Sequence, residues 1–323
     1  MDSMNKLRLV FGDNMLGVHG QGFRYVFSYF GGLDSLVIQE KEWLYRSPRP
    51  TFWRAVTDND RGNRFHLRSG MWYAADMFLK CASCKVWVDG EAVEPLPIAP
   101  YNNSYDGTET ARTVKLLFTY ETITVPSTKV EITYEVNTEG EILVAAHYFG
   151  QKGLPQLPVF GMRFIMPTKA IGYEYEGLSG ETYPDRMAGG IPGVYQVEGL
   201  PVTPYMVPQD CGMHMDTKWL QVVRNSTLSN IDKSKDNFAL RFEAVEKNFA
   251  FACLPYTAQE LENATHHEEL PPARRTVVTI LGAVRGVGGM DSWGADVEPQ
   301  YHISGEKDIE YCFKISIGAF SVG

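Results

Sequence analysis

The sequence has little of what would connect it to nucleic acid or to a membrane. Its 323 residues carry 30 Lys and Arg against 39 Asp and Glu, a formal net charge of −9. Nucleic acids and anionic lipid surfaces attract clusters of Lys and Arg, so this balance argues against both as partners. The most apolar run, Thr276–Val284, is bounded by Arg275 and Arg285 and is far shorter than the roughly 20 residues of a transmembrane helix.

Cysteine is also scarce. The five cysteines are an odd number and lie scattered along the chain, at Cys81, Cys84, Cys211, Cys253 and Cys312. Such a set suits a reducing compartment better than a disulfide framework. The N-terminus lacks the long apolar core and the small-residue cleavage site of a signal peptide. We therefore expect a cytoplasmic protein.

Aromatic and turn-forming residues, by contrast, are plentiful. Aromatics make up 12% of the chain, with 30 Gly and 18 Pro. Tyr, Phe and Trp favour strands, and Gly and Pro interrupt them with turns. Lys129–Val136 alternates apolar and polar residues, which is typical of a half-buried antiparallel strand. Because there is no βαβ alternation, repeat or low-complexity linker, the sequence predicts one large antiparallel β unit with long loops.

Two segments are predicted to be helical. Phe65–Lys80 has mixed apolar residues and no proline. Thr257 and Glu260 have the spacing of a capping box, in which each side chain accepts a hydrogen bond from a backbone N–H of the first turn. The helix that follows should end before Pro271. We expect an all-β fold with one or two short helices.

Most short motifs are too incomplete to indicate a reaction. Cys81 and Cys84 form a lone CxxC without further zinc ligands nearby, which we interpret as two ordinary thiols at a helix end. Asp58–Asn63 reverses the order of ligand and glycine in a calcium loop. His266–Pro271 lacks the second histidine of HExxH, and Gly286–Gly289 lacks the βαβ context of a dinucleotide site. We predict no metal and no cofactor site in this chain.

Five segments, in order along the chain, resemble one known family. They are PTFWRAVTDNDRG (50–62), EGLSGETYPDR (176–186), YMVPQDCGMH (205–214), PYTAQEL with ATH (255–261 and 264–266) and GGMDSWG (288–294). Each is similar to a signature of the C-terminal domain of large bacterial beta-galactosidases. Strand-like sequence flanks them, so the resemblance covers essentially the whole chain. Val56 and Gln209–Gly212 depart from the commonest family pattern.

The resemblance implies a large antiparallel β-supersandwich, which is the galactose mutarotase-like fold, as a single domain over residues 1–323. In two-gene beta-galactosidases of lactic acid bacteria such a domain forms a small subunit, and this chain has the right size and its own Met1. The family's catalytic glutamates and magnesium ligands lie in a barrel for which this chain has no room. The expected partners are therefore a large subunit, which would hold the magnesium, and a galactoside such as lactose. No catalytic residue is expected here, and the isolated chain is expected to be inactive.

The resemblance also implies which residues line the active site. In the family, the Trp of the Asp-Ser-Trp motif faces the aglycone side of the pocket, and that position is Trp293 here. An indole offers a flat apolar face to sugar C–H groups; the alternative is a core aromatic. A mobile family loop beside the site corresponds to Asp58, Asn59, Asp60 and Gly62, where glycine would act as a hinge. A turn held by local hydrogen bonds is the alternative for that segment.

Two other functions are compatible with the sequence. A free-standing mutarotase-like aldose epimerase would need a histidine acid and a carboxylate base in one pocket, and His147, His214 and His302 are available. A carbohydrate-binding or assembly module would have no role in an active site. Four residues of the second resembling segment are expected to hold the fold or an interface rather than to react. They are Glu181, Tyr183, Asp185 and Arg186.

Overall fold

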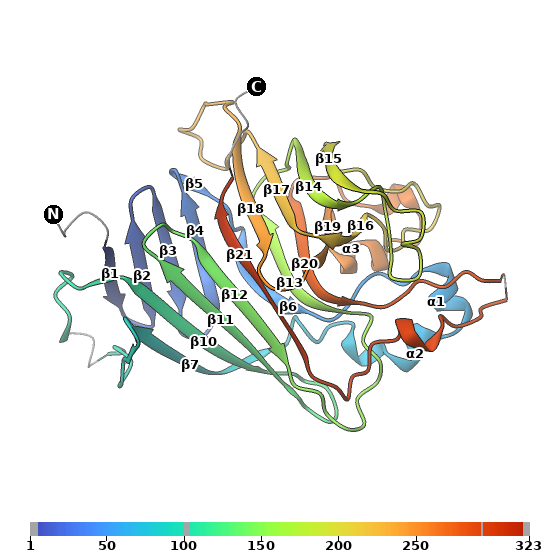
Figure 1. Cartoon of the computed structure of the whole chain (residues 1–323), viewed down its shortest axis with the longest axis horizontal. Coiled ribbons are helices and arrows are strands. Elements are labelled where there is room, and N and C mark those ends of the chain that lie inside the picture. Colours follow the sequence, from blue (N-terminus) through green and yellow to red (C-terminus); the bar gives the residue numbers. More distant parts are fainter. Residues whose placement is uncertain (1–5, 100–103, 292, 319–323) are drawn as a thin grey trace.

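The computed structural model describes residues 6–99, 104–291 and 293–318, and within them the chain forms three sheets of antiparallel strands (Figure 1). The ten-stranded sheet has the order β15 (Pro192–Glu198), β14 (Gly172–Leu178), β17 (Trp219–Arg224), β18 (Phe238–Ala244), β21 (Ile309–Ile317), β12 (Ile142–Tyr148), β11 (Lys129–Asn137), β10 (Thr113–Glu121), β7 (Lys80–Val88) and β8 (Glu91–Ala92). The six-stranded sheet has the order β5 (Lys41–Glu42), β4 (Gly32–Ile38), β3 (Phe23–Ser28), β2 (Met15–Gly20), β1 (Leu7–Gly12) and β9 (Thr110–Ala111). The five-stranded sheet has the order β16 (Met213–Thr217), β19 (Phe249–Leu254), β20 (Thr276–Val284), β13 (Val159–Met166) and β6 (Arg46–Thr51).

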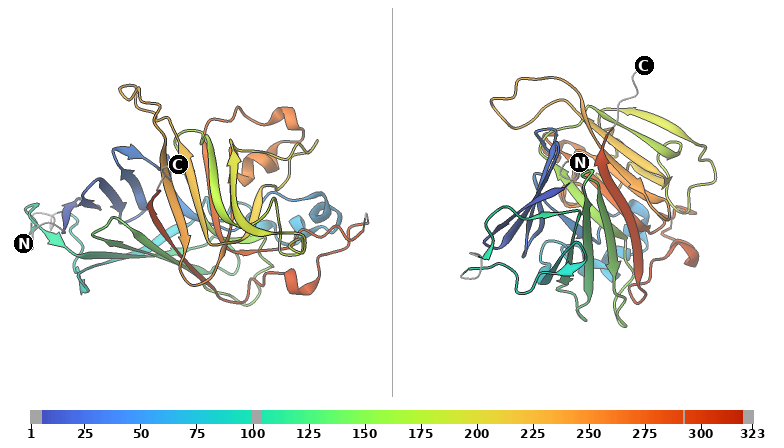
Figure 2. Two further views of the ribbon diagram at one scale, coloured as in Figure 1. Left: turned by 45° about the horizontal axis from the view of Figure 1, so that its top comes forward. Right: turned by 60° about the vertical axis from the view of Figure 1, so that its left-hand side comes forward.

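The two smaller sheets form one layer that covers the ten-stranded sheet (Figures 1 and 2). On one half, Phe27 of β3 packs against Tyr134 of β11, with ring centroids 5.6 Å apart. On the other half, Phe164 of β13 packs against Phe242 of β18, with centroids 5.1 Å apart. One apolar cluster of buried residues extends through all three sheets. The prediction of a large antiparallel β-supersandwich is confirmed.

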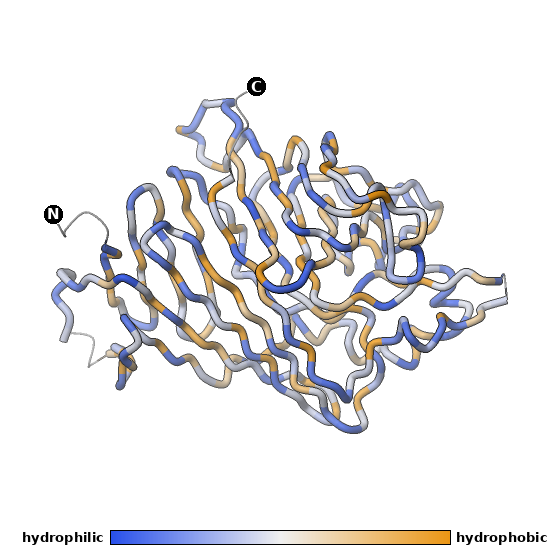
Figure 3. The backbone as a smooth tube through the Cα atoms, in the orientation of Figure 1, coloured by the Kyte–Doolittle hydropathy of each residue, from blue (hydrophilic) through white to orange (hydrophobic). Residues whose placement is uncertain are grey.

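The strand expected at Lys129–Val136 is β11, and it shows how the sequence pattern produces the sheet. Val130, Ile132, Tyr134 and Val136 are at most 1% exposed, whereas the residues between them are partly accessible. Successive side chains of a strand point to opposite faces, so one face enters the core and the other meets solvent. The same alternation of apolar and polar positions runs along many strands in Figure 3.

The helices are short. Those described are α1 (Asp58–Gly62), α2 (Phe65–Arg68) and α3 (Ala258–Asn263), with 3-10 turns η1 (Gly70–Trp72), η3 (His267–Glu269) and η4 (Pro299–Tyr301). One or two short helices were expected, and the described residues form three short α-helices. In α3 the capping box of Thr257 and Glu260 is confirmed. Nowhere in the described ranges is a helix long and apolar enough to cross a membrane.

The helix predicted over Phe65–Lys80 is wrong beyond its first turn. α2 ends at Arg68, and the chain continues through η1 and turns until β7 begins at Lys80. β7 pairs with β10, where Lys80 lies opposite Glu121, so strand pairing at a distance overrides the local preference. Cys81 and Cys84 therefore lie on a strand and not at a helix end.

Candidate functional site

The segment expected as a loop, Asp58–Gly62, is the one-turn helix α1, and a capping box fixes its start. The Thr57 hydroxyl accepts a hydrogen bond from the backbone N–H of Asp60, and the Asp60 carboxylate accepts one from the backbone N–H of Thr57, at 3.0 Å. Each side chain therefore satisfies a backbone donor that the helix leaves free. Because Asp60 is 0% exposed, its charge needs buried partners.

Two arginines are those partners. The Asp60 carboxylate lies 2.6 Å from Nη1 of Arg54 and 3.1 Å from Nη1 of Arg285, and Arg285 also pairs with Asp296. We call Arg54, Asp60, Arg285 and Asp296 the ion cluster. Burial raises the pKa of Asp60, but Arg54, the hydrogen bond from Thr57 and the charge of Arg285 outweigh this and hold the pKa below its ordinary value. Asp60 is therefore ionised, and it connects α1 to the end of β20.

After β20 the chain forms the Trp293 loop, which we define as Gly286–Asp296. It extends past α1 at the right of Figure 1. Trp293 is 90% exposed, which excludes a core aromatic and leaves the indole open to a ligand. Oδ1 of Asp291 accepts hydrogen bonds from the backbone N–H groups of Trp293, at 2.9 Å, and Ala295, at 3.0 Å. These bonds set the turn that presents the indole.

Residues outside the Trp293 loop hold its base. The Asp185 carboxylate accepts hydrogen bonds from the backbone N–H groups of Val287, at 3.0 Å, and Gly288, at 2.7 Å. Arg186 donates to the carbonyl oxygen of Gly288, and the Asn59 amide donates to the carbonyl oxygen of Val287 at 3.0 Å. Asp185 and Arg186 thus have the supporting contacts expected from the sequence, and Asn59 joins the loop to α1.

Gly62 and Gly294 allow α1 and the Trp293 loop to touch through their backbones. A Cβ on Gly62 would lie 3.0 Å from Cα of Gly294, and a Cβ on Gly294 would lie 2.6 Å from the carbonyl carbon of Gly62. Gly294 also has φ +88, which non-glycine residues rarely adopt. The position of α1 therefore fixes the backbone beside Trp293, so the predicted hinge segment and the predicted sugar platform form one packed unit.

Contacts from the third segment and from α3, whose sequence belongs largely to the fourth segment, reach α1 and the residues just before it. Gln209 accepts a hydrogen bond from the backbone N–H of Asp58 at 2.9 Å and donates to its carboxylate at 3.3 Å. Glu262 of α3 accepts one from the backbone N–H of Val56 at 2.7 Å. Folding thus brings five segments, spread between residues 50 and 294, to the same end of the molecule.

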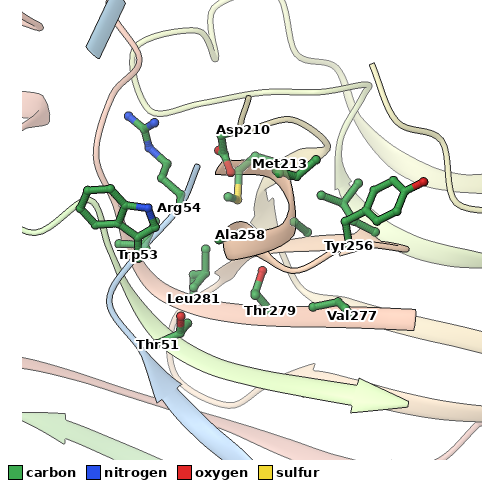
Figure 4. Close-up of a pocket in the computed structure, with 14 residues that line it drawn as sticks. Thr51, Trp53, Arg54, Asp210, Met213, Tyr256, Ala258, Val277, Thr279 and Leu281 are labelled. Carbon is green, nitrogen blue, oxygen red and sulfur yellow. The ribbon is translucent and has the colours of Figure 1, made fainter. Parts of the chain in front are cut away.

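A small, largely apolar cavity of about 40 Å³ lies between the five-stranded sheet and α3 (Figure 4). Arg54 and Asp210 lie at one end and Tyr256 at the other. This volume suits a water molecule, whereas ligand pockets usually have several hundred Å³. Burial raises the pKa of Asp210 to about 7, although Arg54 and a hydrogen bond from the Tyr183 hydroxyl, 2.8 Å away, oppose the shift.

The histidines considered for an epimerase have other partners. His214 is buried, its Nε2 lies 3.0 Å from the Tyr173 hydroxyl, and burial lowers its pKa to about 4. His147 has Nε2 3.1 Å from Asp308 and Nδ1 3.3 Å from Glu310, so both ring nitrogens are engaged. His302 has Nδ1 3.1 Å from the Gln156 amide nitrogen and Nε2 3.0 Å from the carbonyl oxygen of Val297. An acid–base pair open to an aldose is thus found at none of the three histidines, and the epimerase alternative is not favoured.

Of the ion cluster, sequence reasoning singled out Asp60 and missed Arg54, Arg285 and Asp296. Arg285 is 0% exposed and directly follows the apolar run Thr276–Val284. An arginine between a buried strand and Gly286 was the available signal, because a buried guanidinium needs carboxylate partners. Within the described ranges, no group of three or more His, Cys, Asp or Glu side chains has an arrangement that could hold a metal ion.

Comparison with known proteins gives a consistent result. Residues 19–317 match the family model described as beta galactosidase small chain. The chain is 59% identical, over 98% of its length, to a beta-galactosidase small subunit of Latilactobacillus sakei, which it covers completely. It is 33% identical to a beta-galactosidase of Halalkalibacterium halodurans over 96% of this chain, but it spans only 28% of that protein. It is 31% identical to a beta-galactosidase of Bifidobacterium adolescentis over 91% of this chain, and it spans 26% of that protein. A putative aldose 1-epimerase structure from Escherichia coli K12 aligns with 97% of this chain and 99% of its own, at 9% identity and a TM-score of 0.44.

Proposed function

The chain belongs to the beta-galactosidase small-chain family, and on this premise we propose that it is the small subunit of an enzyme that hydrolyses terminal beta-D-galactosides such as lactose. It matches a separate small subunit over that protein's full length but about a quarter of the longer beta-galactosidases. A large subunit would supply the remaining part of those longer proteins, with the catalytic glutamates and the magnesium. In this assembly the chain acts as one domain over residues 1–323 and needs no cofactor of its own.

The exposed indole of Trp293 carries the proposal for the active site. A large aromatic side chain that is 90% exposed gains little from the fold, so its presence points to a contact outside the chain. Asp291 and Gly294 fix the backbone on either side, so little conformational freedom is lost when a sugar binds. We infer that Trp293 stacks on the aglycone of the galactoside while the galactose ring lies in the large subunit.

The carboxylates around Trp293 support this division of labour. Retaining hydrolysis of a glycoside needs two carboxyl groups about 5 Å apart that face the scissile bond. Here Asp60 is enclosed in the ion cluster, Asp185 accepts two backbone N–H groups, and Asp291 accepts two more. Each of these three carboxylates is engaged within the chain, which supports the proposal that the acid and the nucleophile belong to the large subunit.

The chain is also proposed to reside in the cytoplasm. Its five cysteines are thiols in the structure, and Cys211 and Cys253 are buried, where burial raises the pKa of each thiol and disfavours the reactive thiolate. A reducing compartment keeps such an odd set of thiols unpaired. Neither nucleic acid nor a membrane is proposed as a partner.

Reconstitution tests the proposed function. The purified chain should not hydrolyse a chromogenic beta-galactoside, the large subunit alone should have little activity, and the mixture should be active at a defined molar ratio. Turnover by the rigorously purified chain alone would refute the assignment of the catalytic carboxylates to the partner. Equal activity of the large subunit with and without this chain would refute its place in the active site.

A further inference from the structure

An arginine-lined pocket of about 230 Å³ lies at the edge of the five-stranded sheet, where β6 is the outermost strand. None of its lining residues belongs to the Trp293 loop or to the ion cluster. The residues come from β6, from β13 and from the turn that follows η1. They are Arg46, Ser47, Arg49, Asp76, Met77, Arg163 and Ile165.

The pocket carries more positive charge than its own carboxylates neutralise. Arg163 pairs with Asp76 at 2.5 Å, and both side chains are buried. Among the ion pairs of the described residues, none includes Arg46 or Arg49. Burial lowers the pKa of Arg46, and the charges of Arg163 and Arg275 lower it further, whereas Tyr45 and Glu260 oppose the shift without cancelling it. The arginines at this site therefore repel one another. Arg46 is exposed and Arg49 is partly exposed, so both guanidinium groups are accessible to a partner. In a chain with a net charge of −9, such a concentration of arginine makes an anionic partner favourable here.

The rim of the pocket is apolar and exposed. Met77 lines it and is 61% exposed, and the next residue, Phe78, is 59% exposed. Methionine, aromatic residues and arginine are the side chains enriched in protein interfaces, and exposed large apolar side chains mark such surfaces. A small free anion would neutralise the arginines but would leave these side chains in water, so the rim favours a protein as the occupant.

We propose that this pocket receives an acidic side chain of the large subunit, with Met77 and Phe78 packed beside it in the same interface. The proposal rests on the proposed function, because it takes the large subunit as the partner. A guanidinium binds a carboxylate through two parallel hydrogen bonds, which set direction as well as affinity. Arg46 and Arg49 would therefore orient the two subunits, so that the Trp293 loop reaches the partner's active site.

The test is charge reversal with a matched control. Arg46→Glu with Arg49→Glu should weaken association with the large subunit at least about a hundredfold, because a close interfacial charge pair becomes a repulsion. Lys85→Glu with Lys115→Glu changes the charge equally on exposed positions of β7 and β10, and should change the affinity less than about threefold. Affinity is measured by isothermal titration calorimetry at 50 and 300 mM NaCl. The parent's affinity should fall with salt much more than that of the reversed variant.

Two further variants keep the test decisive. Arg46→Gln with Arg49→Gln removes the positive charges without introducing repulsion and should weaken association about tenfold. This variant provides the test if the charge-reversed variant does not fold. Met77→Ser with Phe78→Ser should also weaken association, because the rim loses its apolar contact. Circular dichroism and thermal unfolding confirm the fold of each isolated variant.

The alternative outcomes are distinct. Association of the folded arginine variants within threefold of the parent would overturn the proposal. If inorganic phosphate raised the Tm of the parent but not of the arginine variants, and association were unchanged, the pocket would be a site for a free anion instead. If the parent itself did not bind the large subunit, the proposed function would fail, and this inference with it.

Discussion

Asp60 and Arg285 form a buried ion pair between α1 and the end of β20, with Oδ1 of Asp60 3.1 Å from Nη1 of Arg285. Both side chains are 0% exposed. The pair lies at the root of the Trp293 loop, and the backbone contact between Gly62 and Gly294 lies farther along the same loop. The hydrogen bond from the Asn59 amide to the carbonyl oxygen of Val287 is a third link. Because these contacts join α1 to the Trp293 loop, a movement of the Asp58–Gly62 segment would carry the loop and the indole with it.

Loss of the Asp60 charge should destabilise the fold. Asp60→Asn would leave Arg54 and Arg285 buried with too little negative charge, which costs about 3–5 kcal/mol in comparable networks. The free energy of unfolding from urea denaturation measures the effect. Asp58→Asn, on the exposed face of the same helix, is the control and should cost less than about 1 kcal/mol. Similar losses in the two variants would show that the ion cluster does not hold the fold.

Gly294→Ala should move the Trp293 loop. The new Cβ would lie 2.6 Å from the carbonyl carbon of Gly62, and the residue would keep an unfavourable φ of +88. A displacement of about 1 Å in a positioning loop can cost about a hundredfold in rate, so kcat/KM for lactose should fall at least about tenfold in the assembled enzyme. Gly199→Ala is the control, because Gly199 also has a positive φ, +67, but no atom lies within 4 Å of the new Cβ. It therefore measures the effect of backbone strain without the contact. Equal kcat/KM for both variants would contradict a role for the contact with Gly62.

Trp293→Ala should impair the use of the aglycone. If one indole face covers about 80 Å² of apolar surface, its loss costs about 2 kcal/mol at roughly 25 cal/mol per Å², or about thirtyfold in affinity. kcat/KM for lactose and the ratio of transfer to hydrolysis should both fall, because a sugar acceptor would use the same platform. Hydrolysis of the galactosyl-enzyme should change much less.

Met290→Ala is the matched control for Trp293→Ala, because Met290 lies in the same loop and is 63% exposed. Its kcat/KM for lactose should stay within about twofold of the parent. If the Trp293 variant also stays within twofold while the subunits assemble, the indole has no contact with the aglycone and the assignment of the site is wrong.

Asp210 should give a pH-dependent contribution to stability that is opposite in sign to that of Asp60. Its pKa is raised from 3.8 to about 7, so between these values the folded state binds more protons than the unfolded state, and stability falls as pH rises. Asp210→Asn removes this dependence, so the unfolding free energy of the variant relative to the parent should increase by a few kcal/mol between pH 4 and pH 8. Urea denaturation at several pH values, with the exposed Asp236→Asn as control, measures it. A difference that is constant with pH would show that Asp210 is ionised throughout.

For Asp60 the pKa is lowered, so its ionised form stabilises the fold at neutral pH and this contribution is lost as pH falls below about 4. The parent should therefore lose more stability on acidification than Asp60→Asn does. The same denaturation series extended to pH 3 measures the effect. A parallel decline of the two proteins would contradict it.

Local pattern was enough for those elements whose cause is local. The alternation at Lys129–Val136 predicted β11, and the spacing of Thr257 and Glu260 predicted the start of α3. The same spacing of Thr57 and Asp60 starts α1, although a one-turn helix was not expected there. At Phe65–Lys80 the local pattern led to a wrong prediction, because β7 is set by its pairing with β10.

The sequence by itself determined the antiparallel β class, the family resemblance and the residues to inspect, Trp293 and Asp58–Gly62 among them. These depend on residue types and on spacings along one segment of chain. Only the tertiary structure decided that Asp60 pairs with Arg285, that Gly62 touches Gly294 and that Arg46, Arg49 and Arg163 share a pocket. Those relationships join segments on different strands and loops. They arise because burial of apolar faces between the sheets selects one arrangement of the strands, and that arrangement brings charges and glycines together whose separation in sequence carries no signal.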